Sequence, residues 1–282
     1  SLAKPNRPLV PYLLLGAIWA AITLYNLDKA FHIDDTAYLE TAQWIAKHPL
    51  HPMRGLVNWS GDDPEPIHRI NQPLLHAYLL AGWGSIFGFT EIPLHLMQSL
   101  FSLAAILIFY LLAREIAPDL ALLLAVLWAV CPALVVEQNI MTDVPLVSLW
   151  IAFYYLLITR RFHSDAARYA SAGMVAGAAL LVKYSSLPML PALALDMVFR
   201  RRFRQLPWLA PPLLILGAWS LFNWLDYGGI PILDRPVGEI SMYAAIKHIF
   251  PYLIAMGAIS PFSIIFIAGF LDKPKSAATI AG

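Results

Sequence analysis

Apolar residues are gathered into eight long runs that are separated by polar segments. The runs cover about residues 8–27, 91–113, 119–136, 144–159, 169–182, 185–199, 207–224 and 249–271. A helix needs about 20 apolar residues to cross a bilayer, and shorter runs cross with little tilt or lie among neighbouring helices. The pattern therefore predicts an all-α fold, a polytopic transmembrane helical bundle of about eight spans.

A further apolar segment, residues 73–89, differs from the other eight. Gly82, Gly84 and Gly88 interrupt it, and it carries His76. Its aromatic side chains suit the boundary between lipid and water, where tryptophan and tyrosine are enriched. We expect a juxtamembrane helix that lies on the membrane surface.

The composition also indicates a membrane protein. Hydrophobic residues make up 59% of the 282 residues and charged residues 13%, whereas soluble domains have roughly 45–50% and about 25%. We expect one transmembrane domain over residues 1–282 and no large soluble domain. Cys131 is the single cysteine, so we expect neither a disulfide nor a metal site built on paired cysteines.

Lysine and arginine are distributed unevenly between the two ends of the predicted spans. If the amino terminus lies in the cytoplasm, the inner segments hold twelve of the 19 basic residues but five of the 18 acidic ones. An excess of lysine and arginine marks the cytoplasmic side. Two long loops, residues 28–72 and 227–248, then face outward. Lys4 and Arg7 precede the first run without a cleavage pattern after it, so we expect that run to remain as an anchor.

Two adjacent carboxylates, Asp34 and Asp35, open a helical pattern in the first outer loop. The residues that share one helical face are Ala37, Tyr38, Thr41, Ala42 and Ile45. An aspartate at a helix start can cap free backbone N–H groups and meet the positive end of the helix dipole. A cap needs one aspartate, so the second aspartate has no role in it. A structural role and a chemical role both remain possible interpretations of this pair.

The predicted topology brings five ionisable residues to one membrane face, namely Asp34, Asp35, Arg69, Asp143 and Lys183. Ionisable groups near hydrocarbon are costly and usually face a cavity or a partner. Each has a structural alternative: Asp143 as the N-cap of the helix after it, Lys183 as a cation that reaches the interface, and Arg69 as an ordinary loop residue. Their joint occurrence indicates a site at the outer face.

Four histidines, His48, His51, His68 and His76, fall in or beside the first outer loop. Zinc sites favour short and defined ligand spacings, and these histidines lack them. We expect no metal and no other cofactor, and keep a divalent metal as the open alternative.

Several short motifs resemble a known family. They are Asp34-Asp35-Thr-Ala-Tyr38, Asn71-Gln-Pro73-Leu-Leu before an aromatic helix that ends Ile86-Phe87-Gly88, Thr142-Asp143-Val-Pro145-Leu, and Leu180-Leu-Val-Lys183-Tyr184-Ser. In this order they resemble the polytopic glycosyltransferases of the GT-C class that use lipid-linked sugars. That class includes the protein O-mannosyltransferases and the aminoarabinose transferase of lipid A.

The resemblance implies an enzyme that transfers a sugar from a polyprenyl phosphate to an acceptor hydroxyl on the extracytoplasmic face. Asp34 matches the catalytic base of the family, the first acid of an Asp-Glu pair. Asp35 stands where glutamate is commoner, so its supporting role departs from the pattern. Arg69 is the nearest match to the cation that contacts the donor phosphate, and Lys183 is the second candidate. The resemblance also implies a bacterial inner membrane location and further spans beyond these.

The substrate-site candidates are Tyr38, His68, Asn71, Asp143, Tyr184 and Arg235. The partners that we expect are the lipid bilayer, a polyprenyl-phosphate-linked sugar, and a lipid, glycan or protein acceptor, with no nucleic acid. The competing class is a transporter or flippase for a lipid-linked or anionic substrate. A transporter usually has acids at bilayer depth and repeated halves with broken helices, whereas the acids here gather at one face.

Overall fold

The computed structural model describes residues 9–234, except 33, 59–62, 71 and 137, together with residue 247. The predicted span at 249–271 lies outside these residues. The α-helices of the described part are α1 (Val10–Asn26), α2 (Asp35–Lys47), α3 (Ile67–Ile70), α4 (Leu75–Phe87), α5 (Glu91–Ile116), α6 (Ala121–Ala129), α7 (Pro132–Val136), α8 (Asp143–Ile158), α9 (Asp165–Val182), α10 (Met189–Phe199) and α11 (Ala210–Tyr227). The predominantly helical fold is confirmed.

Shorter elements connect these helices. They are the 3₁₀ helices η1 (Pro52–Arg54), η2 (Pro118–Leu120), η3 (Tyr184–Ser186) and η4 (Phe203–Leu209), and the strands β1 (Leu56–Val57) and β2 (Glu65–Pro66). The two strands pair antiparallel, with Leu56 opposite Pro66. This two-residue ribbon is an exception to the all-α prediction, and it lies in a stretch that the sequence marks only as irregular.

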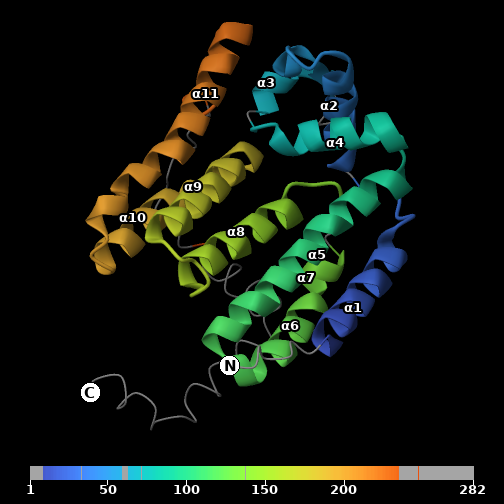
Figure 1. Cartoon of the computed structure of the whole chain (residues 1–282). Coiled ribbons are helices and arrows are strands. Elements are labelled where there is room, and N and C mark those ends of the chain that lie inside the picture. Colours follow the sequence, from blue (N-terminus) through green and yellow to red (C-terminus); the bar gives the residue numbers. More distant parts are fainter. Residues whose placement is uncertain are drawn as a thin grey trace.

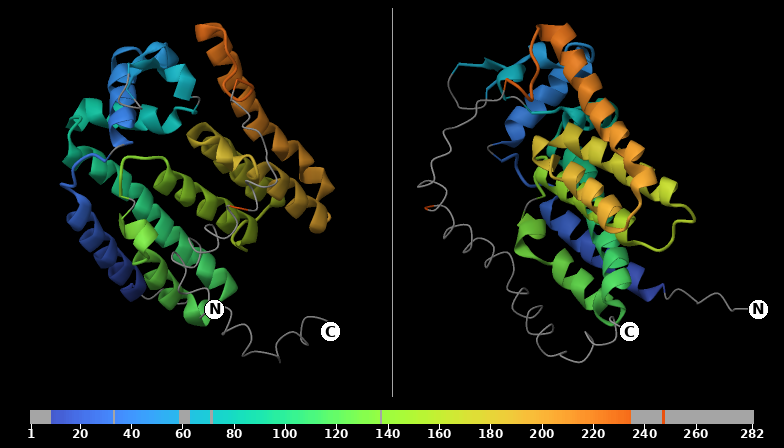
Figure 2. Two further views of the ribbon diagram at one scale, coloured as in Figure 1. Left: turned by 180° about the vertical axis from the view of Figure 1, so that it is seen from behind. Right: turned by 90° about the vertical axis from the view of Figure 1, so that its left-hand side faces the viewer.

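The long helices form a bundle with a separate layer at one end (Figure 1). Helix α5 packs against α1 and α6 on one side and against α8 on the other. Helix α9 packs against both α8 and α11. We call the layer that contains α2, η1, β1, β2, α3 and α4 the cap. The cap lies at the same end of the bundle in each view of Figure 2, so the bundle has a cap end and an opposite end.

Two helices of the described residues are long and apolar enough to cross a membrane, Glu91–Ile116 and Phe203–Tyr227. The other apolar helices are shorter, and they are Val10–Asn26, Pro118–Ala129, Asp143–Ile158 and Tyr184–Phe199. The number of about eight spans is therefore not confirmed and stays a prediction.

The predicted run at 119–136 is not one continuous helix. The structure divides it into α6 and α7 at Val130 and Cys131. Pro132 explains the break, because proline has no N–H and disfavours the helical conformation of the residue before it. The single span expected here was wrong in that detail, and Cys131 is buried at the break.

The segment at 73–89 is helical, as expected, and forms α4. The helix ends at Gly88, whose φ of 100° is a conformation that favours glycine. Helix α4 lies across the end of the bundle, at a steep angle to α11 (Figure 1). Its position on a membrane surface stays a prediction.

Small residues on α9 allow close packing against α11. A Cβ atom added to Gly177 would lie 2.5 Å from Cδ1 of Ile215, and one added to Gly173 would lie 2.7 Å from the backbone oxygen of Trp208. At Gly173 the close atom belongs to the backbone and glycine is required by distance, whereas at Gly177 a larger residue would force the Ile215 side chain to move. The contact brings α11 beside the carboxyl end of α9, where Lys183 follows.

Charged and aromatic contacts attach the cap to the end of α11. Nε of Arg54 lies 2.8 Å from Oδ1 of Asp226, and its Nη2 donates to the backbone oxygen of Asp226. The ring of His68 stacks on Tyr227 with centroids 4.9 Å apart. The cap and α11 thus meet at the cap end of the bundle.

Candidate active site

The two adjacent aspartates have different environments. Helix α2 begins at Asp35, and Asp34 precedes it at the N-cap position without a side-chain capping hydrogen bond. Asp34 is half-buried, and its carboxylate makes no hydrogen bond or ion pair with the residues that the structure describes. The capping alternative is therefore wrong for Asp34, which leaves its carboxylate available.

Asp35 has a structural contact instead. Its side chain is fully buried, and Oδ2 accepts a hydrogen bond from the backbone N–H of His32 at 2.8 Å. Burial raises the pKa of the Asp35 carboxyl, and the hydrogen bond from His32 acts in the opposite direction. Asp35 thus fixes the segment before α2, directly beside Asp34.

Asp143 and Lys183 form an ion pair. Helix α8 begins at Asp143, with Thr142 at the N-cap position, so the N-cap alternative for Asp143 was wrong. Nζ of Lys183 lies 3.0 Å from Oδ1 of Asp143, although the residues are 40 positions apart in the chain. Both side chains remain partly exposed, so the pair is accessible.

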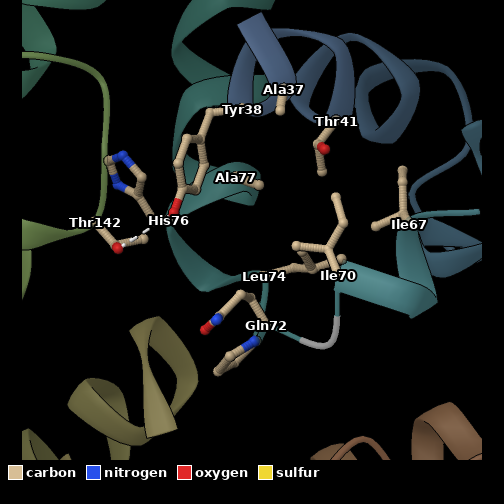
Figure 3. Close-up of a pocket in the computed structure, with 11 residues that line it drawn as sticks. Ala37, Tyr38, Thr41, Ile67, Ile70, Gln72, Leu74, His76, Ala77 and Thr142 are labelled. Carbon is tan, nitrogen blue, oxygen red and sulfur yellow. Dashed lines mark hydrogen bonds between the residues drawn. The ribbon is translucent and has the colours of Figure 1, made fainter. Parts of the chain in front are cut away.

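Tyr38 joins α2 to the start of α8. Its hydroxyl lies 3.4 Å from Oγ1 of Thr142 (Figure 3). Burial raises the pKa of Tyr38, the hydrogen bond with Thr142 lowers it, and the negative charges of Asp143, Asp34 and Asp35 raise it. The charges of three carboxylates from two distant segments therefore act on one tyrosine hydroxyl.

A short loop, residues 138–142, places Asp143 at this position. Its hydrogen bonds come from Ser102 Oγ to Gln138 Oε1 at 2.8 Å, Lys29 Nζ to Asn139 Oδ1 at 2.6 Å, His76 Nε2 to Ile140 O at 2.9 Å and Gln98 Nε2 to Met141 O at 2.9 Å. Four of the loop residues are buried, where polar groups need partners. The donors come from α4, α5 and the segment after α1, so three parts of the chain hold the loop.

His76 on α4 is buried beneath the site. Its Nε2 N–H donates to the carbonyl of Ile140, and its ring lies edge-on to Tyr38 with centroids 6.1 Å apart. Burial lowers the pKa of His76 to about 4. His76 is therefore neutral at pH 7 and acts as a fixed donor to the loop.

A pocket opens beside Tyr38 between α2, α3 and α4 (Figure 3). It is lined by Ala37, Tyr38, Thr41, Ile67, Ile70, Gln72, Pro73, Leu74, His76, Ala77 and Thr142. Six of the eleven lining residues are apolar, and the polar ones are Tyr38, Thr41, Gln72, His76 and Thr142. Six of these lining residues fall within the motifs quoted from the sequence, namely Ala37, Tyr38, Gln72, Pro73, Leu74 and Thr142, whereas Ile67 and Ile70 of α3 do not.

The other predicted site residues lie around this centre. Tyr184 is buried and its hydroxyl accepts a hydrogen bond from Nε1 of Trp219 at 3.1 Å. The side chain of Arg69 is 63% exposed, with Nη1 4.0 Å from a carboxylate oxygen of Glu65. His68 lies on Tyr227, as described above. Asn71 and Arg235 fall outside the described residues.

The four histidines of the first loop have four different contacts. His48 stacks on Trp44, His51 lies against Asp226, His68 stacks on Tyr227 and His76 donates to Ile140. Within the described part of the chain, no group of three or more histidine, cysteine, aspartate or glutamate side chains is arranged to hold a metal ion. The histidines therefore have structural contacts in place of a shared ligand set.

Asp226 is a buried charge that sequence reasoning missed. With Trp219 and Asn223 it lies at intervals of four and three residues, the spacing of one helical face. Asn223 and Asp226 are both buried on that face. Polar residues at this spacing in an apolar helix were the signal that α11 has a polar contact surface.

A family profile described as dolichyl-phosphate-mannose-protein mannosyltransferase matches residues 71–223, more than half of the chain. No curated protein matches. A solved structure, the crystal structure of ArnT from Cupriavidus metallidurans bound to undecaprenyl phosphate, is similar with a TM-score of 0.68 and 14% sequence identity. The similarity covers 95% of this chain and 52% of ArnT, so the chain spans about half the length of that protein.

Proposed function

Because the chain belongs to the dolichyl-phosphate-mannose-protein mannosyltransferase family, we propose that it is a membrane glycosyltransferase. The donor is a sugar linked to a polyprenyl phosphate, and the acceptor is a hydroxyl of a lipid, glycan or protein on the extracytoplasmic face. The observation that carries this proposal is the carboxylate of Asp34, which has no partner among the described residues. Asp34 and Asp143, the acid of the ion pair with Lys183, both act on the hydroxyl of Tyr38. The undecaprenyl phosphate bound to the similar structure supports the class of donor.

Asp34 acts as the general base. The acceptor oxygen attacks the anomeric carbon of the sugar, the bond from that carbon to the phosphate oxygen breaks, and the acceptor proton passes to the Asp34 carboxylate. The leaving group is polyprenyl phosphate, which carries one more negative charge than it did in the donor. A direct displacement inverts the anomeric centre, so no second carboxylate is needed as a nucleophile.

Lys183 and Arg69 bind the donor phosphate in this scheme. The ammonium group of Lys183 has three donors, so it can contact a phosphate oxygen while Asp143 holds it in place. A cation near the departing oxygen stabilises charge that grows as the bond breaks. Arg69 is exposed and 4.0 Å from Glu65, and the donor would draw it away from that weak contact.

The remaining residues position these groups. Asp35 is buried and fixes the start of α2, so its role is to orient Asp34 and not to accept the proton. Tyr38 lies where it can hydrogen-bond to a sugar or acceptor hydroxyl. Tyr184, which follows Lys183, and His68 belong to the walls of the site. Asn71 and Arg235 stay candidates on the basis of the sequence.

Replacing Asp34 with asparagine tests the proposal. The amide has the same size but does not accept the proton, so we expect single-turnover sugar transfer to fall at least about 100-fold. Binding of polyprenyl phosphate should stay unchanged, because a general base contributes mainly in the transition state. Asp35→Asn is the matched control, with a smaller loss. Normal turnover by a folded Asp34→Asn protein would remove Asp34 from the mechanism and return a transporter to consideration.

A further inference from the structure

A basic and aromatic turn lies at the end of the bundle opposite the cap (Figure 1). It connects α10 to η4 and contains the residues Phe199, Arg200, Arg201, Arg202, Phe203 and Arg204, all of them exposed. Four arginines in five positions give this turn a high density of positive charge. The proposed mechanism uses none of these residues.

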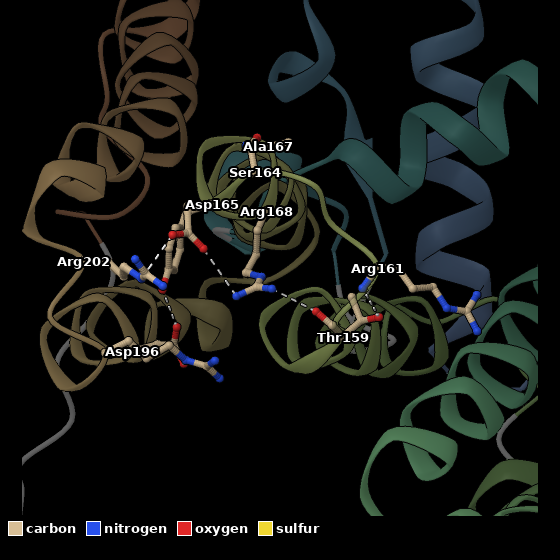
Figure 4. Close-up of polar contacts among 10 residues, drawn as sticks. Thr159, Arg161, Ser164, Asp165, Ala167, Arg168, Asp196 and Arg202 are labelled. Carbon is tan, nitrogen blue, oxygen red and sulfur yellow. Dashed lines mark hydrogen bonds and ion pairs between the residues drawn. The ribbon is translucent and has the colours of Figure 1, made fainter.

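Two of the four arginines are paired with acids, one on α10 itself and one on α9. Nε of Arg200 lies 2.9 Å from Oδ1 of Asp196, and Nε of Arg202 lies 3.1 Å from Oδ2 of Asp165. Figure 4 shows Asp165 shared between Arg202 and Arg168, whose Nη1 is 3.6 Å away. These acids are therefore already engaged with cations.

Arg201 and Arg204 differ from the other two arginines. Among the described residues, neither side chain forms an ion pair, and both are exposed. Within the described part of the chain, the turn thus holds two cations that no acidic side chain neutralises. An anion with two or more oxygens is the ligand that complements such a pair.

Arg201 has a backbone conformation in which glycine is the usual residue. The N–H of Arg202 bonds to the carbonyl of Met197 at 2.7 Å and that of Arg201 to Val198 at 2.9 Å, which is the hydrogen-bond pattern of a Schellman helix end. This pattern places Arg201 at a φ of 56°. Glycine is usual at that position, so the turn does not need an arginine for its shape.

Two aromatic rings flank the arginines. Phe199 is 80% exposed and Phe203 is 56% exposed. Exposed phenylalanines beside arginines are typical of a surface that rests in the interface of a membrane, with rings toward the acyl chains and cations toward phosphates. A soluble phosphate would leave both rings in water, so the rings favour a lipid.

We propose that this turn binds the headgroup of an anionic phospholipid in the leaflet opposite the candidate active site. Arg201 and Arg204 contact the phosphate, and Phe199 and Phe203 insert beside the acyl chains. The inference rests on the membrane placement in the proposed function and does not depend on the reaction.

The test is a lipid titration of the full chain in neutral detergent, followed by native mass spectrometry. Phosphatidylglycerol is the anionic probe and phosphatidylcholine the neutral one. We expect the protein to retain phosphatidylglycerol preferentially, and the Arg201→Gln/Arg204→Gln double variant to bind it about 10- to 30-fold more weakly. Inorganic phosphate should not displace the lipid, because it lacks acyl chains.

Three controls separate this site from general charge. Arg160→Gln removes another exposed cation outside the turn and should bind the lipid as the unmutated protein does. Phe199→Ser/Phe203→Ser keeps the arginines and should weaken binding. Arg201→Gly relieves the backbone conformation, so it should retain or raise the melting temperature while lowering lipid affinity.

Equal retention of both lipids would overturn the proposal, as would unchanged phosphatidylglycerol binding by the double arginine variant. Displacement by inorganic phosphate would assign the arginines to a soluble anion and also overturn it. Sugar transfer measured in neutral lipid provides an independent reading. Failure of transfer with intact lipid binding would count against the proposed function alone.

Discussion

Nδ1 of His51 in the cap lies 2.6 Å from Oδ1 of Asp226 on α11. The same carboxylate oxygen is 2.8 Å from Arg54, so two cap residues share one buried acceptor. His51 and Arg54 are each about half exposed, whereas the Asp226 side chain is buried. This contact attaches the cap, which carries Asp34, to the helix that packs beside Lys183.

Loss of the Asp226 carboxylate should loosen this attachment. We expect Asp226→Ala to lower the stability of the protein by about 1.5–3 kcal/mol, the usual contribution of a hydrogen bond to a charged group. A double-mutant cycle with Arg54→Ala should show coupling, because both variants remove the same contact. Thermal melting in detergent measures it, and additive effects of the two substitutions would show that the contact contributes no stability.

Removal of either cation that we propose to bind the donor phosphate should weaken donor binding and slow sugar transfer together. Lys183→Ala and Arg69→Ala should each weaken binding of polyprenyl phosphate about 10- to 150-fold and slow single-turnover transfer. Lys47→Ala, at the exposed end of α2, is the matched control and should bind normally. If both variants bind the lipid as the unmutated protein does, the phosphate site is wrong.

The raised pKa of Asp35 has a consequence for stability. The unfolded carboxyl has the ordinary pKa of 3.8 and the folded one a higher pKa, so the folded state binds more protons between these two pKa values. Stability therefore falls as pH rises through that interval. Asp35→Asn keeps the acceptor for His32 and lacks the ionisation, so its melting temperature should lose this decline. Parallel pH profiles for both proteins would contradict the assignment.

His76 should produce the opposite slope. Its pKa is lowered from 6.5 to about 4, so the unfolded state binds more protons between these values and stability falls as pH decreases from 6.5 toward 4. The maximum loss is about 3 kcal/mol, because each pKa unit corresponds to about 1.4 kcal/mol. His76→Gln retains a donor for Ile140 without titrating. Its melting temperature should change less between pH 7 and pH 5.

The two glycines on the facing helices α9 and α11 make a matched pair. A Cβ at Gly177 would lie 2.5 Å from Ile215, whereas a Cβ at Gly217 has nothing within 4 Å. Gly177→Ala should destabilise the protein by about 1–3 kcal/mol through overpacking. Gly217→Ala should stabilise it by up to about 1 kcal/mol, since alanine favours a helix. Melting temperatures that shift in the same direction would contradict the packing argument.

The periodic and apolar patterns predicted those features that depend on neighbouring residues. Local periodicity predicts the helix that begins beside Asp34 and the helix at 73–89. Counting the apolar runs places Asp143 and Lys183 at the same end of the bundle. The break before Pro132 was missed because mean hydropathy does not register a missing N–H. The number of spans depends on helix length, which an apolar run defines only approximately.

Long-range hydrogen bonds could not be predicted in the same way. Gln98 and Met141 are 43 positions apart, and Lys29 and Asn139 are 110 apart. A single side chain can donate to many backbone oxygens, so the amino-acid sequence does not specify which oxygen accepts the hydrogen bond. The distinction between Asp34 and Asp35 likewise depends on burial, which two adjacent identical residues do not reveal.

The loop at 138–142 has a consequence for the order in which the site forms during synthesis. All its side-chain donors from α4, α5 and the segment after α1 lie within residues 29–102, so the ribosome produces them first. Folding during synthesis generally proceeds in the order in which the parts of a protein are made, as it does for successive domains. The loop can therefore reach its final position as soon as it emerges, with Asp143 already beside Tyr38. Lys183 is synthesised 40 residues after Asp143 and then forms the ion pair with it.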